Sequence, residues 1–361
     1  MNWQIERSGD KVLLFIYGGN GERGVGMKCN YCEWHCELGD DNYGVCRMYH
    51  EENGAIKERF PHKWCTYAIS RVESVPFYHA YPGSRSMVIG TTGCNMACRY
   101  CVNAFVAKEE PAALQDKMYA FAPEALVRMA VKRGCHNIIF NVNEPAVSLP
   151  SLVEVSKVAR VAGIPMGCLT NAYTTEEATE LLASIFSFVN VSLKGLANDF
   201  CREYLGIPDI NPVLRNIDKL ASLTHVEVTT PVIQSVNDHE MDQIAIFLAD
   251  VDRQIPWHVF RLLPEYKMKE ALYPNIEAIN AALEKSRELL PYIYFHNFVG
   301  SDWVNTLCPR CGTAVIERFS LGCGGDRLDR YNCRDKACPD CGYEIKLYGD
   351  RVEWNAQGGQ L

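Results

Sequence analysis

The residues of this sequence best suited to chemistry are its cysteines. The chain has 361 residues, 17 of them cysteine. Most fall in three groups: Cys29, Cys32, Cys36 and Cys46; Cys94, Cys98 and Cys101; and Cys308, Cys311, Cys323, Cys333, Cys338 and Cys341. Grouped cysteines in a chain with no secretory segment indicate metal binding or catalysis rather than a disulfide framework. The four isolated ones are expected to be small buried side chains: Cys65, Cys135, Cys168 and Cys201.

The central group has the spacing C-x3-C-x2-C, from Cys94 through Cys98 to Cys101. Three thiolates in one short loop suit a [4Fe–4S] cluster with three irons bound by protein. The fourth iron then stays open, as a catalytic metal centre requires. A zinc knuckle that lacks one ligand is the alternative, and it gives no role to Tyr100 directly before the third cysteine.

The C-terminal group contains two C-x2-C knuckles, which begin at Cys308 and Cys338. Four thiolates from two turns satisfy the tetrahedral geometry of structural zinc, and thiolate-bound iron is the rival interpretation. The knuckles lie farther apart than in most zinc ribbons. Cys323 and Cys333, which lie between them, are interpreted as free thiols, alternative ligands or a disulfide.

The N-terminal group runs from Cys29 to Cys46 and allows two metal interpretations. Its spacing fits a second iron–sulfur cluster or a zinc ion, and spacing alone does not separate them. Four cysteines without a metal are the remaining alternative, and His35 is a possible substitute ligand.

Seven apolar runs alternate with helical patterns between residues 86 and 300. The runs are Met87–Gly90, Ile138–Val142, Met166–Leu169, Phe188–Leu193, Val226–Val232, His258–Leu262 and Tyr292–Phe295. Pro123 predicts a helix start, and Thr174 with Glu177 predicts a capping box. This alternation is typical of parallel βαβ units. Six or seven such units predict an α/β fold, a partial (β/α)6-type barrel with its chemistry at the carboxyl ends of the strands.

The flanks of this barrel differ from it in composition. Residues 1–85 are loop-rich, with a predicted N-terminal hairpin, and are expected to form a cysteine-rich metal-binding region; residues 301–361 are expected to form a domain like a zinc ribbon. The net charge of −8 provides no broad basic surface, so nucleic-acid binding is not implied. No signal peptide or membrane-length apolar run is seen, which predicts a cytoplasmic protein.

The central motif resembles that of the radical S-adenosylmethionine (radical SAM) superfamily. The wider sequence resembles the AmmeMemoRadiSam family, relatives of the pyruvate formate-lyase activating enzymes. Segments in all three parts carry the resemblance: 29–36, 44–47, 77–83, 143–145, 170–171, 192–194, His258, 264–268, 305–312 and 338–342.

The resemblance implies that the cluster binds SAM and that residues after the strands hold it. Glu144 matches the acidic residue that accepts hydrogen bonds from the SAM ammonium, and Lys194 matches the position that meets the carboxylate. Ser192 stands where relatives usually have an acidic residue. The full set of expected cofactor-binding residues is Tyr100, Asn143, Glu144, Asn171, Ser192, Lys194, Ile233 and His258.

The resemblance also implies an activity: reductive cleavage of SAM to a 5′-deoxyadenosyl radical, which abstracts hydrogen from a substrate. Kinship with activating enzymes suggests a protein substrate, framed by the two metal-ordered flanks, and an electron donor such as flavodoxin or ferredoxin. Radical modification of a small molecule or cofactor precursor is the second hypothesis. A non-enzymatic, metal-rich scaffold that binds nucleic acid or protein is the third.

Overall fold

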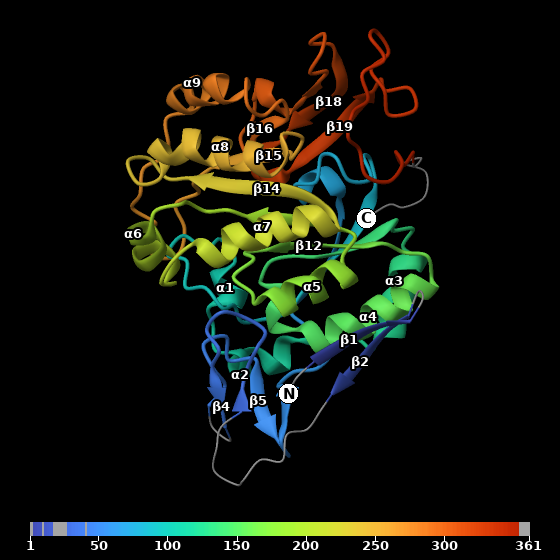
Figure 1. Ribbon diagram of the computed structural model, residues 1–361, viewed down its shortest axis with the longest axis vertical. Helices are drawn as coiled ribbons and strands as arrows, with labels where there is room; N and C mark the ends of the chain where they lie inside the picture. Colours follow the sequence, from blue (N-terminus) through green and yellow to red (C-terminus); the bar gives the residue numbers. More distant parts are fainter. Residues whose placement is uncertain (1–2, 9–10, 17–26, 40–41, 354–361) are drawn as a thin grey trace.

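The computed structural model describes residues 3–8, 11–16, 27–39 and 42–353 (Figure 1). Within these ranges the centre is one eight-stranded sheet of order β16-β15-β14-β13-β12-β11-β9-β8. Its strands are β8 (Thr66–Arg71), β9 (Arg85–Gly90), β11 (Asn137–Phe140), β12 (Met166–Thr170), β13 (Phe188–Ser192), β14 (His225–Val232), β15 (Trp257–Arg261) and β16 (Ile293–His296). Strands β9 and β11 to β16 are parallel and follow chain order, and β8 pairs antiparallel with β9. The predicted α/β fold around a parallel sheet is confirmed.

Six helices connect consecutive parallel strands: α3 (Pro123–Lys132), α4 (Leu149–Val161), α5 (Glu176–Ile185), α7 (Asn211–Leu223), α8 (Met241–Asp252) and α9 (Ile276–Ser286). The remaining helical turns are short: α1 (Ala104–Ala107), α2 (Pro111–Leu114), α6 (Asn198–Phe200), η1 (Val72–Ser74), η2 (Gln115–Lys117), η3 (Pro145–Val147), η4 (Cys201–Leu205), η5 (Asp238–Glu240), η6 (Asp302–Val304) and η7 (Gly322–Gly324). No helix among the described residues is both long and apolar enough to cross a membrane.

Sequence signals predicted the starts of helices α3 and α5 to within one residue. Helix α3 begins at Pro123 as predicted, because proline presets the helical φ where its missing N–H costs nothing. Helix α5 is capped by Thr175, whose hydroxyl accepts a hydrogen bond from Ala178 N at 3.2 Å. The predicted capping residue, Thr174, is therefore wrong, because its hydroxyl is bonded to Thr179 Oγ1 at 2.7 Å instead.

The core lies between the sheet and its helices. All four residues of β11 are buried, as expected for a parallel strand covered on both faces. Cys135, Cys168 and Cys201 are buried in this core, as expected of isolated cysteines. Cys65 is only half-buried.

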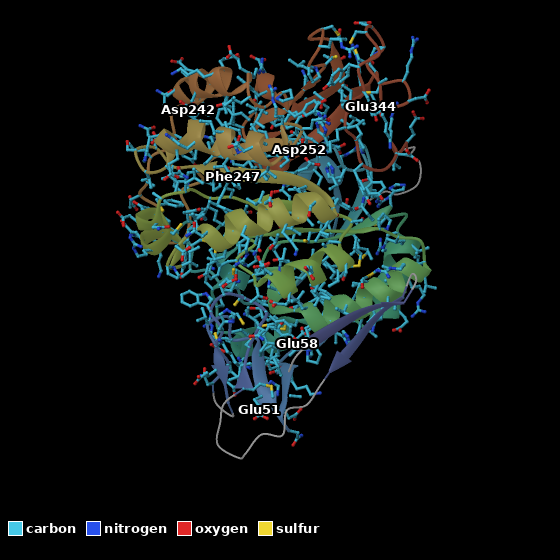
Figure 2. The ribbon with its side chains drawn as sticks, viewed as in Figure 1. Glu51, Glu58, Asp242, Phe247, Asp252 and Glu344 are labelled. Carbon is cyan, nitrogen blue, oxygen red and sulfur yellow. The ribbon has the colours of Figure 1, made fainter. Side chains whose placement is uncertain are left out.

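The N-terminal part consists of short antiparallel pairs. They are β1 (Trp3–Ser8) with β2 (Lys11–Ile16), β3 (Met27–Lys28) with β4 (Glu37–Leu38), β5 (Tyr49–Glu52) with β6 (Ala55–Glu58), and β7 (Lys63–Trp64) with β10 (Tyr119–Ala120). The first pair is the predicted hairpin. Glu58 joins this part to α4, since its carboxylate accepts hydrogen bonds from Ser151 N at 3.1 Å and Ser151 Oγ at 2.8 Å (Figure 2). Strand β8 lies in the predicted region 1–85 yet pairs within the barrel sheet, so the boundary at residue 85 stays a prediction.

The C-terminal part contains, in the described residues, a three-stranded antiparallel sheet of β17 (Thr306–Leu307), β18 (Ala314–Ser320) and β19 (Asp326–Tyr331). We call it the C-terminal sheet; it lies at the opposite end of the molecule from the N-terminal pairs (Figure 1). Its buried side chains share a core with Tyr294 of the outer strand β16, with Tyr292 just before that strand, and with Tyr78. Lys346 also pairs with Asp252 at the end of α8, a residue that Figure 2 marks.

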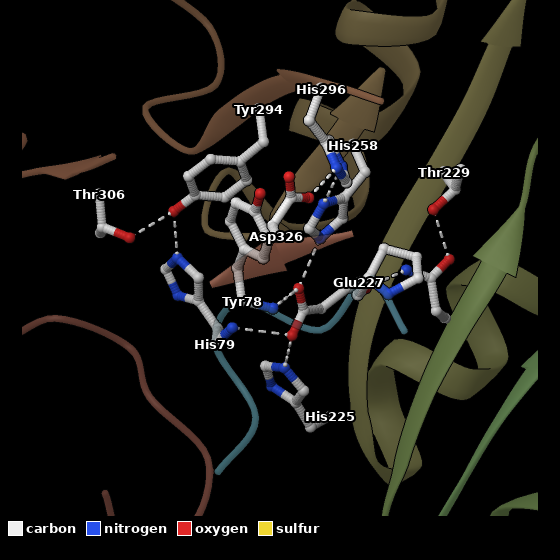
Figure 3. Close-up of polar contacts among 12 residues, drawn as sticks. Tyr78, His79, His225, Glu227, Thr229, His258, Tyr294, His296, Thr306 and Asp326 are labelled. Carbon is white, nitrogen blue, oxygen red and sulfur yellow. Dashed lines mark hydrogen bonds and ion pairs between the residues drawn. The ribbon is translucent and has the colours of Figure 1, made fainter. Parts of the chain in front are cut away.

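A buried carboxylate, Glu227 on β14, fastens the segment 77–83 to the barrel (Figure 3). It accepts hydrogen bonds from the backbone N–H groups of Tyr78 and His79, both at 2.9 Å. The rings of His225 and His258 also contact it, at 3.1 and 2.7 Å. Burial alone would raise the pKa of Glu227, but the two histidines outweigh it and hold that pKa well below the usual range.

Residues 77–83, which we call the connector, are bound by the barrel on one side and by the C-terminal sheet on the other. Arg318 of β18 donates to Tyr78 O at 2.7 Å and lies over the Tyr78 ring, 4.1 Å from its centre. His79 contacts Tyr294 Oη at 2.6 Å, and His296 contacts Asp326 of β19 at 2.6 Å (Figure 3). This segment, which carries part of the family resemblance, therefore anchors the C-terminal sheet.

Candidate active site and cysteine centres

The three central cysteines lie in the loop between β9 and α1, and Asn143 holds that loop from β11. The Asn143 amide oxygen accepts a hydrogen bond from Thr91 N at 3.0 Å. Its amide nitrogen donates to Thr91 Oγ1, Thr92 O and Gly93 O at 2.9 to 3.0 Å. These contacts use both ends of the amide, so Asn143 fixes the path of the backbone just before Cys94.

Gly93 is required by the close approach of the N-terminal part. It has a φ of +75°, and a Cβ there would lie 2.7 Å from Cys46 O. Beyond Cys94 the loop is held from the other side, because Ala97 N and Arg99 N donate to backbone carbonyls of η4 at 2.7 and 2.9 Å. The cysteine loop is thus tied to three separate elements.

A pocket of about 430 Å³ opens beside this loop at the carboxyl ends of the strands. Nine of the predicted site residues line it: Cys94, Cys98, Tyr100, Cys101, Asn143, Glu144, Asn171, Ser192 and Lys194. Two predicted residues, Ile233 and His258, do not. Ile233 is buried beside Asn237, and His258 lies in the Glu227 network behind the pocket wall. Their SAM contacts stay predictions.

Glu144 is a buried carboxylate at the end of the pocket near the cysteines, 2% exposed. Its oxygens accept hydrogen bonds from Thr170 Oγ1 at 2.8 Å, Asn171 N at 2.7 Å and Ala146 N at 3.2 Å. Burial raises the pKa of Glu144 to about 7, although these bonds and Lys194 oppose the rise. Glu144 forms no ion pair within 4.0 Å in the described residues, so its carboxylate is open to direct pairing with the ammonium of a ligand.

Lys108, just after α1, is a pocket residue that the sequence analysis missed. Its ammonium donates to Met96 O within the cysteine loop. Burial would lower the pKa of Lys108, but the charges of Cys94, Cys98 and Cys101 outweigh it and raise that pKa. A lysine seven residues beyond Cys101 was visible in the sequence, but only the fold turns it back toward the thiolates.

The far end of the pocket is built by β15, β16 and the C-terminal part. Arg261, His296 and Asn297 line it from the barrel, and Cys323 and Asp326 from the C-terminal part. Except for Cys323, sequence patterns did not mark these residues, because they approach only when the C-terminal sheet packs on β16. The C-terminal part therefore forms a wall of the pocket.

The C-terminal knuckles bring four thiols together. Cys308 Sγ lies 3.5 Å from Cys341 Sγ, and Cys311 Sγ lies 3.6 Å from Cys338 Sγ. All four sulfurs are within 4.8 Å of one another, which makes a metal-binding group. Cys323 and Cys333 lie outside it. The Cys333 thiol instead donates to Val315 O at 3.8 Å.

The N-terminal cysteines also come together. Cys29, Cys32, Cys36 and Cys46 line one small pocket with Tyr31, Leu38, Tyr49 and Asn95 among its other walls. This pocket is separate from the large one, and Asn95 follows Cys94 directly in the chain.

Comparison with known proteins identifies a family model that matches part of the sequence. Residues 88–248 match the family model described as "Radical SAM superfamily". A protein of Methanocaldococcus jannaschii, called "Uncharacterized protein MJ0808", is 29% identical over 326 residues, which are 89% of this chain and 95% of that one. The "GTP 3′,8-cyclase" of Thermodesulfovibrio yellowstonii is 26% identical over 55% of this chain, and the match spans 63% of the cyclase.

Among solved structures, Streptococcus suis SuiB bound to S-adenosylmethionine is similar, with a TM-score of 0.44 and 14% identity over 57% of this chain and 48% of that one. The fold and the site together define a class of protein. Its members have a domain of parallel strands with three cysteines in the loop after the first parallel strand. Residues 88–248 of this protein therefore form a radical SAM superfamily domain. The narrower resemblance to the AmmeMemoRadiSam family stays a prediction.

The pocket suits the group that this class requires. Glu144 provides a buried carboxylate that forms no ion pair within 4.0 Å in the described residues, which fits the ammonium of an amino acid. Lys108 and Lys194 provide positive charge beside the three thiols and the pocket. The donor set therefore agrees with a thiolate-bound cluster and a zwitterionic ligand.

The pKa of Glu144 leads to a testable dependence of SAM affinity on pH. Below pH about 7 this carboxyl gains a proton and loses its attraction for an ammonium, so we expect the SAM dissociation constant to fall as pH rises from about 6 to about 7.5. Glu144→Gln should weaken binding roughly 10- to 150-fold, the equivalent of ~1.5–3 kcal/mol for a hydrogen bond to a charged group.

Isothermal titration of the cluster-loaded protein with SAM measures this affinity. The matched control is Glu203→Gln, since Glu203 pairs with Arg99 on the exposed surface. A wild-type affinity that does not change over this pH range, or an unaltered pH profile in Glu144→Gln, would show that Glu144 does not bind the ammonium.

Proposed function

We propose that this protein binds SAM in the large pocket and removes a hydrogen atom from a substrate that enters beside the C-terminal sheet. The observation that carries the proposal is the convergence of Cys94, Cys98 and Cys101 with Glu144 and Lys194 on one pocket. When bound, a [4Fe–4S] cluster supplies one-electron reductive cleavage of SAM, with a donor such as flavodoxin or ferredoxin.

The chain's own groups would position the cofactor. Glu144 would hold the ammonium and Lys194 the carboxylate, while Tyr100 and Asn171 contribute to the walls near the loop. Lys108 would offset the negative charge of the thiolate-bound centre. Because the pocket is bounded by barrel and C-terminal residues together, it would also limit access of water to the reacting atoms.

Replacement of the central cysteines tests this proposal. Anaerobically reconstituted, dithionite-reduced protein should convert SAM to 5′-deoxyadenosine. We expect Cys94→Ala, Cys98→Ala or Cys101→Ala each to abolish that product, because three thiolates are needed to hold the cluster.

Liquid chromatography of the quenched reaction quantifies 5′-deoxyadenosine. Cys135→Ala is the control, because Cys135 is buried away from the pocket. Normal turnover by any one of the three loop variants would refute the assignment of the cluster.

We further propose zinc at Cys308, Cys311, Cys338 and Cys341. A tetrahedral zinc ion bound at about 2.3 Å places its sulfur ligands about 3.8 Å apart, close to the two Sγ–Sγ distances of 3.5 and 3.6 Å. Hydrogen bonding with Thr313 also lowers the pKa of Cys311 to about 6, which favours the thiolate that zinc binds.

Loss of this zinc should loosen the C-terminal part and leave the central cluster in place. We expect Cys311→Ala to lower zinc from about one ion per chain to none and to increase amide hydrogen exchange in residues 306–347. Cys323→Ala is the matched control and should retain zinc. Retention of zinc in Cys311→Ala, or loss of iron from that site instead, would contradict the assignment.

For the substrate we propose a protein segment whose reacting residue enters the pocket. The pocket of about 430 Å³ has the size of a site for one small ligand, and SAM would take up part of it. The rim includes exposed Cys323 of the C-terminal part, where the rest of a long substrate would lie. The match to GTP 3′,8-cyclases favours the second candidate, a small molecule such as a nucleotide.

Isotope transfer separates the two candidates. Protein partners from a deuterated culture of the source cells, separated by size from metabolites, should transfer deuterium into 5′-deoxyadenosine when added to reduced enzyme and SAM. Mass spectrometry of the product provides the readout. Transfer from the low-molecular-mass fraction alone would replace the protein substrate by a small molecule.

A further inference from the structure

The N-terminal cysteines share a hydrogen-bonding pattern with the two other cysteine groups. Backbone N–H groups donate to the sulfurs of Cys29, Cys32 and Cys46, in each case from the residue two positions later. Cys36 Sγ accepts from Val45 N at 3.4 Å. All four sulfurs of the small pocket therefore face a backbone donor.

The same two-residue relation recurs at Cys94, Cys101, Cys311 and Cys341. The isolated cysteines differ. In the described part of the chain, no backbone N–H contributes to the pKa of Cys65, Cys135, Cys168 or Cys201. Backbone N–H donors stabilise a thiolate more than a thiol. The pattern is therefore typical of cysteines that bind a metal, and it argues against four free thiols in the small pocket.

Charge supports the same conclusion. None of the described residues that line the small pocket is a lysine or an arginine. The large pocket, in contrast, places Lys108 and Lys194 beside the three central cysteines. Four buried thiolates in this pocket thus need a bound cationic centre.

The spacing of the sulfurs distinguishes a single ion from a cluster. In the described part of the chain, the C-terminal quartet is the one group of three or more possible ligands whose atoms all lie within 4.8 Å of one another. Neither the N-terminal quartet nor the central trio meets that limit. A mononuclear zinc ion needs sulfurs about 3.8 Å apart, whereas thiolates on different irons of a cluster lie farther apart.

The small pocket also adjoins the central loop. The Cys46 carbonyl contacts Gly93, and Trp34 Nε1 donates to Asn95 O at 2.7 Å. Asn95 lines the small pocket, while Asn171 Nδ2, which lines the large one, donates to Asn95 Oδ1 at 2.8 Å. Asn95 therefore joins the walls of the two cysteine sites.

We propose that Cys29, Cys32, Cys36 and Cys46 bind a second iron–sulfur cluster, not zinc, in a pocket directly behind the central cysteine loop. This goes beyond the proposed function, since it assigns a second redox centre that SAM cleavage does not itself require. The test below reads metal content and spectra and does not depend on turnover.

The test removes the central cluster and asks whether iron remains. Full-length Cys94→Ala/Cys98→Ala/Cys101→Ala protein, reconstituted anaerobically with ferrous iron and sulfide, should keep about two to four irons per chain, with matching sulfide, and about one zinc. Adding Cys32→Ala and Cys46→Ala should remove this iron and leave zinc unchanged. Adding Cys65→Ala and Cys135→Ala instead is the matched control, which should keep the iron.

Absence of iron from the triple variant overturns the proposal, as does loss of a zinc equivalent on adding Cys32→Ala and Cys46→Ala. Wild-type protein provides a measurement that does not depend on whether the quintuple variant folds. Its dithionite-reduced electron paramagnetic resonance signal should be broader and relax faster than that of the triple variant, because two neighbouring paramagnets couple. A signal of one isolated cluster in the wild type would also overturn the assignment.

Discussion

The structure depends on how two buried carboxylates are paired. A carboxylate removed from water is costly unless hydrogen bonds or charges replace the solvent. Glu227 receives them all from the protein, two from backbone N–H groups and two from histidines, so it stays charged and fixes the connector 77–83 against the barrel. Glu144 receives three hydrogen bonds but forms no ion pair within 4.0 Å in the described residues, and its pKa rises to about 7. Glu227 therefore stabilises the fold, and Glu144 is available to bind a ligand.

The Glu227 network also determines the shape of the pocket. It holds His258, which contacts His296, which in turn contacts Asp326 on β19. His296 and Asp326 line the far end of the pocket, so the same chain of buried contacts that anchors the C-terminal sheet positions part of the wall that a substrate would meet (Figure 3). The C-terminal part therefore contributes to the wall of the pocket through its packing, although its four-cysteine group does not line the pocket.

The three cysteine groups show how one residue type serves different centres. The C-terminal sulfurs lie close together, as one small ion requires. The central loop presents three thiols to an open pocket, with Lys108 and Lys194 among the charged groups beside it. The N-terminal thiols are enclosed without a cation and lie against the central loop through Gly93 and Asn95. Spacing in the sequence identified the groups, and the surrounding charge and packing distinguish them.

The sequence alone determined the elements and the motif. The seven apolar runs became seven parallel strands in the described chain because each run alternates with a helix, and residues at the ends of parallel strands, such as Glu144 and Lys194, had to meet at one edge. It did not place His258 behind the pocket wall, bring Lys108 to the thiols or supply Asp326 to the pocket. Those positions depend on contacts between residues up to hundreds of positions apart, which no local pattern encodes. Only the tertiary packing of the C-terminal sheet and of the loop after α1 decided them.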